Sequence, residues 1–158
     1  MSSTNSTKSS KPQKIEDSSI WKEANALAEF VYTKLPEFPD EERWDSQRKL
    51  RTAANELIFN IAKAVTNTIP MGAKYDWSYA RKELAALKTM YRFAGRQKFI
   101  ELDPEIMVRL DHLGTAIDAE LASAREAEVK ETKRMQTEDL KPWQEKYRLW
   151  KEMEKRHD

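Results

Sequence analysis

Four cations of the segment 75–97 are spaced so that they would share one side of a helix. At about 100° per residue, the rotation of an α-helix, Arg81, Lys88, Arg92 and Arg96 fall in a sector roughly 80° wide. The apolar stripe of the same segment is centred about 115° away, so the cations would form a contiguous row beside it. Rows of Lys and Arg attract phosphates and carboxylates. The segment therefore predicts a positively charged face suited to an anionic partner.

Further cations crowd the segment 47–63. Three of them stand near the predicted start of a helix, where positive charge opposes the helix dipole at a cost of roughly a few tenths of a kcal/mol. Because these cations are unfavourable for the helix itself, we expect them to contact a partner outside it. The candidate nucleic-acid-binding residues are therefore Arg48, Lys49, Arg51, Lys63, Arg81, Lys82, Lys88, Arg92 and Arg96.

Charge is sorted by segment, although the formal net charge of the chain is only +1. The segments 16–45 and 101–128 each sum to −6, whereas 47–63 sums to +3 and 74–98 to +5. Two interpretations are open. The basic segments pair with the acidic ones, within a chain or between subunits, in exposed pairs worth roughly 0–1 kcal/mol each. Alternatively, they form a nucleic-acid-binding face. Both can hold in a homo-oligomer.

Few residues have the types and spacing that catalysis or metal binding requires. The chain has no Cys, and its two His, His112 and His157, are far apart. The nearest approach to the Glu-x-x-His metal motif of helical bundles is Arg109-Leu-Asp-His112, which has no counterpart elsewhere. There is no Gly-rich phosphate loop. We therefore expect a protein that is not an enzyme, with no metal, no cofactor and no small-molecule substrate.

Apolar residues recur at spacings of three and four in four segments, which predicts four amphipathic helices. The stripes run over residues 20–35, 50–65, 80–94 and 106–124. The scarcity of Gly, three in the whole chain, favours long helices over strands. Connections of about four to nine residues then predict an all-α protein, an antiparallel up-down four-helix bundle over residues 16–129. The Ser-, Thr-, Asn- and Lys-rich residues 1–15 are expected to form a disordered tail.

Capping and breaking residues place the helix boundaries. Asp17, Ser18 or Ser19 can cap the first helix. The third helix is expected to begin near Tyr75, after a break that contains Pro70 and Gly72. Asp103 followed by Pro104 predicts the start of the fourth helix, which could continue to about Met135.

A separate aromatic helix is predicted within the charged extension 130–158. Thr137 or Asp139 could cap it, with Pro142 in its first turn. One face would carry the candidate partner-binding residues Trp143, Tyr147, Trp150 and Met153. Trp and Tyr dominate binding hot spots. Docking on its own bundle, docking on a neighbouring subunit or partner, and stacking on RNA bases all remain open for this helix.

The chain is expected to be cytoplasmic and to have no membrane partner. Its apolar runs are shorter than the roughly 18–20 residues that a membrane span needs, and no apolar signal-peptide region follows Met1.

Several stretches resemble a known bacterial family. They are Trp21-Lys-Glu-Ala-Asn-Ala-Leu-Ala, Phe38-Pro-Asp-Glu-Glu-Arg43, and Leu50 to Ala64 with Asn60-Ile-Ala-Lys-Ala64. The pattern is similar to the four-helix-bundle family that includes proteins encoded in ribosomal-RNA intervening sequences and the Avd accessory proteins of diversity-generating retroelements. The residues Tyr75, Ala80, Leu84-Ala-Ala-Leu87, Tyr91-Arg-Phe-Ala94, Phe99-Ile100 and Leu113-Gly114 look closer to the Avd branch. The resemblance covers about Ile20 to Ala124.

The resemblance implies a function for the basic segments. It implies a homopentameric, non-enzymatic accessory protein with a positive surface. That surface would bind a retroelement reverse transcriptase and its template RNA, and so support mutagenic cDNA synthesis. The alternative is a structural protein–protein interaction module, whose segregated charges drive subunit assembly and which has no role in nucleic-acid binding.

Overall fold

A computed structural model describes residues 14–154, and every regular secondary-structure element in this range is a helix. The expected tail, apart from residues 14 and 15, and His157 lie outside the described residues. Four α-helices and three short 3-10 turns make up the described part. They are η1 (Ile15–Asp17), α1 (Ser19–Lys34), η2 (Leu35–Glu37), η3 (Asp40–Glu42), α2 (Ser46–Thr66), α3 (Pro70–Arg96) and α4 (Pro104–Glu154).

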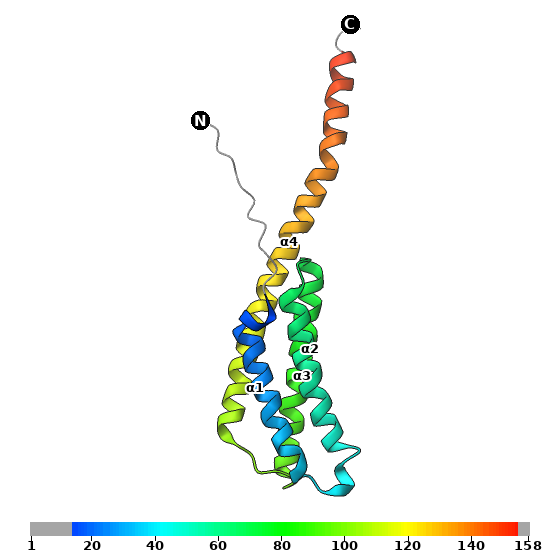
Figure 1. Cartoon of the computed structure of the whole chain (residues 1–158). Helices are drawn as coiled ribbons and strands as arrows, with labels where there is room; N and C mark the ends of the chain where they lie inside the picture. The colour runs from blue at the N-terminus through cyan, green and yellow to red at the C-terminus, as the bar shows by residue number, and fades with distance from the viewer. Residues whose placement is uncertain (1–13, 155–158) are drawn as a thin grey trace.

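The four helices pack in chain order. α1 contacts α2, α2 contacts α3, and α3 contacts α4, while α1 and α4 close the ring. Figure 1 shows α1, α2 and α3 side by side with the first part of α4, joined at alternate ends by short connections. The prediction of an all-α helical bundle is thereby confirmed, and the arrangement is that of an up-and-down bundle.

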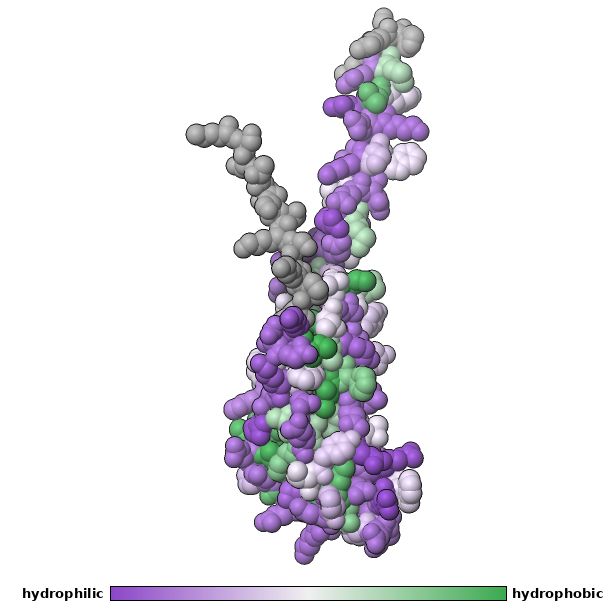
Figure 2. All heavy atoms as spheres, in the orientation of Figure 1, coloured by the Kyte–Doolittle hydropathy of each residue, from purple (hydrophilic) through white to green (hydrophobic). Residues whose placement is uncertain are grey.

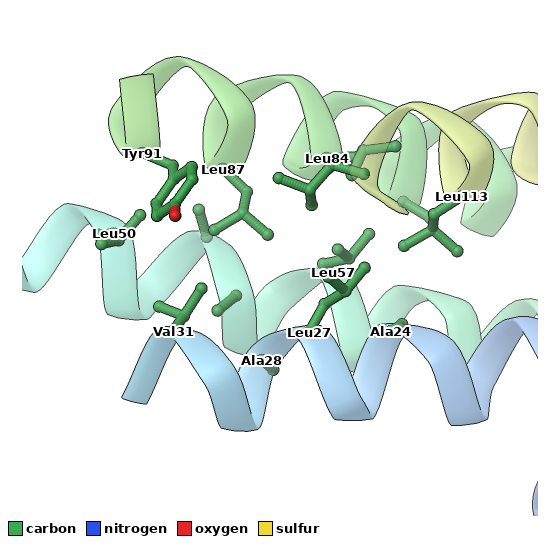
Figure 3. Close-up of a cluster of buried hydrophobic side chains, with 14 of the residues drawn as sticks. Ala24, Leu27, Ala28, Val31, Leu50, Leu57, Leu84, Leu87, Tyr91 and Leu113 are labelled. Atoms are coloured by element: carbon green, nitrogen blue, oxygen red, sulfur yellow. The ribbon is translucent and has the colours of Figure 1, made fainter. Parts of the chain in front are cut away.

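The core is built from the predicted stripes. All four helices contribute fully buried apolar side chains, among them Leu27 of α1, Leu57 of α2, Leu87 of α3 and Ile117 of α4. Figure 3 shows part of this cluster, to which α4 contributes Leu113. Tyr91 is also completely buried, and its hydroxyl accepts a hydrogen bond from the backbone N–H of Asp103 at 2.8 Å. This bond satisfies the one polar group of the ring, and it ties α3 to the residue that precedes α4.

Two of the predicted helix starts are confirmed. The Ser18 hydroxyl accepts a hydrogen bond from Trp21 N at 3.2 Å and so caps α1. The carboxylate of Asp103 accepts one from Glu105 N at 2.9 Å, just before Pro104 opens α4. The start of α3 was predicted wrongly, because α3 begins at Pro70 and not near Tyr75. Pro is favoured in a first helical turn, so Pro70 starts the helix, and Gly72 lies inside it.

The prediction of a separate C-terminal helix is wrong. α4 runs without a break for 51 residues and contains Pro142 in its interior. Its second half leaves the bundle as a single rod, drawn in orange to red in Figure 1. The polar segment before Pro142 has almost no apolar residues, but its Glu, Lys, Arg, Met and Gln are strong helix formers, and it contains no Gly. Low apolar content therefore removes packing partners without ending the helix.

Replacing Pro142 with Ala should stabilise α4 locally. Pro inside a helix removes one backbone hydrogen bond and costs about 3 kcal/mol. Because residues 132–153 are all exposed, the gain should stay in this part of α4. Hydrogen exchange should slow for amides near position 142, while the melting temperature of the bundle stays unchanged. Lys141→Ala is the control, and equal protection in both variants would contradict the expectation.

No helix within residues 14–154 combines the length and the apolar composition that crossing a lipid bilayer requires.

Candidate nucleic-acid interface

Several cations of α3 face α4 and are neutralised there. Arg81 Nε lies 2.6 Å from Asp118 Oδ1, and Lys88 pairs with Asp111. Lys74 Nζ lies 2.6 Å from Glu128 Oε1. These three pairs tie the basic α3 to the acidic α4 along its length. Intramolecular pairing, one of the two interpretations of the charge pattern, therefore accounts for Arg81 and Lys88.

The pairs change the acidity of their carboxylates. The hydrogen bond from Lys88 lowers the pKa of Asp111, and the nearby charge of Arg92 adds to this effect. Between α1 and α4, Arg109 donates to both carboxylate oxygens of Glu23, at 2.7 and 3.1 Å. This fork of hydrogen bonds lowers the pKa of Glu23. The acidic α1 and α4 are thus held together by a cation of α4 itself.

Replacing Glu23 with Gln should weaken the dependence of stability on acid. The pKa of Glu23 lies below its ordinary value of 4.5. Its carboxylate therefore stabilises the fold above that value, and the contribution is lost as the pH falls through the lowered pKa. For a partly exposed pair the effect is about 0.2–1 kcal/mol. Between about pH 7 and about pH 3, urea unfolding should show a smaller loss of stability in the variant. Glu41→Gln is the control, and equal losses in wild type and Glu23→Gln would contradict the account.

The nine predicted cations fall into separate groups. Lys49 pairs with Asp45 at 2.6 Å within α2 and its preceding turn. Lys82 lies over the ring of Tyr79, with its Nζ 5.0 Å from the centroid. Lys82 has no ion pair among residues 14–154, and the same is true of five further exposed cations, namely Arg48, Arg51, Lys63, Arg92 and Arg96.

These five cations do not share one surface. Arg51 lines a pocket of about 360 Å³ with Tyr32 and Phe38, on the side of α2 that faces α1. Arg92 lines a groove with Asp118, on the side of α3 that faces α4. Arg51 is therefore separated from the other candidates, and Arg92 stands beside the α3–α4 ion pairs.

Exposed aromatic rings accompany the remaining cations. On α3, Tyr79, Lys82, Phe93 and Arg96 fall in a sector roughly 100° wide, and the two rings are 51% and 41% exposed. Tyr79 and Phe93 are candidate site residues that the sequence prediction did not include. The signal was present, because Tyr79, Ala86 and Phe93 recur every seven residues on a face other than the core stripe.

An open groove of about 580 Å³ runs between α2 and α3. It is lined from α2 by Arg48, Lys49, Thr52 and Ala53, and from α3 by Glu83, Ala85, Ala86, Thr89 and Met90. Small side chains in the middle of this set leave the surface hollow. The groove, together with the exposed residues along it, is called the α2–α3 face below. Apart from Lys49, which is paired with Asp45, its cations and rings are Arg48, Lys63, Tyr79, Lys82, Phe93 and Arg96.

The predicted partner-binding residues of the C-terminal segment are exposed. Trp143 is 70%, Tyr147 61%, Trp150 49% and Met153 56% accessible. The interpretation in which this segment docks on its own bundle is wrong, because the continuous α4 carries the segment away from the bundle. The rings contact each other and nearby lysines instead, with Tyr147 and Trp150 centroids 6.0 Å apart.

Within residues 14–154, no three side chains of His, Cys, Asp or Glu lie close enough together to hold a metal ion. His112 itself is exposed on α4.

Neither a scan against protein-family models nor a comparison with curated proteins finds a match to this chain.

Proposed function

We propose that this chain is a non-enzymatic RNA-binding accessory protein that uses its α2–α3 face. The observation that carries the proposal is the set of exposed rings interleaved with cations on that face. Tyr79 and Phe93 stand beside Lys82 and Arg96, which have no ion pair among the described residues. Arg48 adds a cation across the groove on α2.

Such a surface has the two features that single-stranded nucleic acid requires. Aromatic rings stack on bases with about 1–3 kcal/mol per base, whatever the sequence. Lys and Arg neutralise phosphates and give affinity that falls with salt. Because no base-reading groove is needed, the α2–α3 face would bind RNA without reading its sequence.

The resemblance to the Avd branch suggests which RNA this would be. By that resemblance, the protein assembles as a homopentamer and binds a reverse transcriptase and its template RNA during cDNA synthesis. The exposed cations of α2 and α3 agree with a positive surface, although Arg81 and Lys88 are paired with carboxylates of α4 in the same chain.

Subunit assembly without RNA is the second candidate function. The observation that favours it is the groove between α2 and α3, whose small side chains Ala53, Ala85 and Ala86 leave room for a neighbouring helix. Exposed acids of α1 and α4 in a second copy would then meet the cations of the groove.

Two variants of equal charge change distinguish the functions. The outer variant is Arg48→Gln, Lys82→Gln and Arg96→Gln, and the inner variant is Lys74→Gln, Arg81→Gln and Lys88→Gln. RNA binding through the α2–α3 face predicts that only the outer variant loses affinity for a single-stranded RNA. Subunit assembly through that face predicts dissociation of the outer variant in light scattering, with no RNA bound to the wild type. Equal RNA affinity in both variants would contradict the RNA-binding proposal.

A further inference from the structure

The part of α4 beyond the bundle carries an exposed apolar patch that packs against no other helix of residues 14–154. This part, residues 129–154, is called the arm. Leu140, Trp143, Tyr147 and Trp150 are spaced by three, four and three residues, which places them in a sector roughly 80° wide. Each is about half exposed or more. Figure 2 shows paler and green residues interrupting the hydrophilic surface of the arm. These four residues form the arm patch.

A second exposed apolar patch lies at the end of the bundle from which the arm leaves. Ile69, Met71 and Tyr75 are 66%, 53% and 54% exposed. They belong to the α2–α3 connection and the first turns of α3. The pair between Lys74 and Glu128 places this end of α3 beside the base of the arm. These three residues form the end patch.

One chain cannot bring its two patches together. Trp143 and Tyr147 follow Glu128 by fifteen and nineteen residues in a continuous helix. At 1.5 Å per residue they stand about 22 and about 28 Å further along α4 than the end patch. The arm patch also lies toward the α3 side, because Trp143 is about 60° around α4 from Glu128, which pairs with Lys74 of α3. The arm and the bundle end thus form an open corner lined by both patches.

We propose that the arm patch docks on the end patch of a second copy of this chain, reciprocally, in a two-fold dimer with antiparallel arms. Each corner receives the arm of the other copy, so both patches of both copies are covered. This contact is isologous and closes on itself, so it joins chains in pairs and is separate from the pentameric contacts that the resemblance implies. It goes beyond the proposed RNA-binding function, since it uses none of the cations and rings named for the α2–α3 face.

Charge favours this occupant over a simple pairing of arm patch with arm patch. Lys146 and Lys151 lie against the rings of the arm patch, with Lys146 Nζ 5.6 Å from the centroid of Trp143. Two arm patches facing each other would bring these lysines together. In the end patch, Lys74 lies against Tyr75, with its Nζ 4.8 Å from the ring centroid, and it is paired with Glu128. An arm patch that meets the end patch of a second copy therefore brings its lysines to a cation that Glu128 already neutralises.

The areas are sufficient for a stable contact. Aromatic side chains bury about 150–250 Å² each, so three rings of roughly 60% exposure offer about 350 Å². Leu140 and the end patch add to this, and the contact occurs twice in a two-fold dimer. The total therefore reaches the region of about 1,000 Å² that specific interfaces require. Amphipathic helices with anchors at this spacing commonly bind in apolar grooves and corners.

Light scattering of the full chain tests the proposal. Trp143→Ser with Trp150→Ser should halve the mass of the assembly, and Met71→Glu should do the same. Trp44→Ser is the matched control, since Trp44 is 74% exposed and lies outside both patches. Circular dichroism should show unchanged helix content in all three variants. An equimolar mixture of the arm variant with Met71→Glu should recover part of the dimer, because one intact arm then meets one intact bundle end.

Three results would overturn the inference. A wild-type chain that is monomeric, or an arm variant whose mass equals that of the wild type, would remove the dimer. Dissociation by the arm variant but not by Met71→Glu would show that the arm patch binds elsewhere. RNA affinity measured on the same samples distinguishes failure of the dimer proposal from failure of the RNA-binding proposal. A variant that loses the dimer but still binds RNA would show that the α2–α3 face does not depend on the dimer.

Discussion

Replacing Leu57 with Ala should lower the free energy of unfolding by about 2–5 kcal/mol. Leu57 lies at the centre of α2, is completely buried, and packs among side chains from the other helices (Figure 3). Ala would leave a cavity that neighbouring helices fill only in part. The free energy of unfolding therefore falls by the lost transfer free energy of the side chain and by a further contribution from the cavity. Single domains have only about 5–15 kcal/mol of stability, and the variant should therefore unfold at much lower urea concentration.

Phe59 provides the control for Leu57, because it is only two residues away on the same helix but is 66% exposed. Phe59→Ala removes a larger side chain and should nevertheless change stability by less than about 1 kcal/mol. Equal destabilisation by the two substitutions would contradict the assignment of the core face of α2.

The second large effect is expected on RNA affinity. The outer variant, Arg48→Gln, Lys82→Gln and Arg96→Gln, should bind single-stranded RNA about 100-fold more weakly than the wild type. The estimate assumes about 1 kcal/mol for each phosphate contact that is lost. The inner variant removes the same amount of charge, but its cations are already paired with carboxylates of α4. It should therefore change affinity by only a few-fold, and titration of a labelled single strand measures both.

The stability of the inner variant must be compared as well. The three lost ion pairs are partly exposed, and such pairs contribute about 0–1 kcal/mol each. A modest fall in melting temperature with RNA affinity retained is the expected combination. The reverse combination, loss of RNA affinity in the inner variant and not in the outer one, would place the binding surface between α3 and α4.

The core of the bundle was predictable because it depends on periodicity. Residues such as Leu50, Leu57 and Ile61 recur at helical spacing, and any tertiary arrangement that buries one of them buries the others. The caps of α1 and α4 were predictable for a similar reason, since Ser18 and Asp103 act on backbone groups a few residues away. Local rules sufficed for both.

The continuity of α4 was harder to predict. The segment before Pro142 lacks an apolar stripe. This pattern therefore predicts that the fourth helix ends near Met135 and that a separate helix follows. Helix propensity depends on backbone and rotamer entropy instead, and the residues of this segment favour helix even without packing. Pro142 costs one hydrogen bond, which α4 tolerates without a break.

The use of each cation could not be read from its position on a helical wheel. Arg81, Lys88, Arg92 and Arg96 share one sector of α3, yet only Arg81 and Lys88 meet carboxylates of α4. Pairing depends on how α3 and α4 are aligned along their axes, which one helix does not determine. The exposed rings of Tyr79 and Phe93 were missed for a related reason. An apolar residue outside the core stripe can be recognised as a candidate binding residue only when its neighbours in the folded structure are known.

The salt dependence of RNA binding tests the central claim most directly. For single strands, each neutralised phosphate contributes about −0.7 to the slope of log affinity against log salt. Removal of the three outer cations should therefore make the slope of the outer variant shallower by about 2, while the inner variant keeps the slope of the wild type. Identical slopes for the wild type and the outer variant would contradict RNA binding by the α2–α3 face.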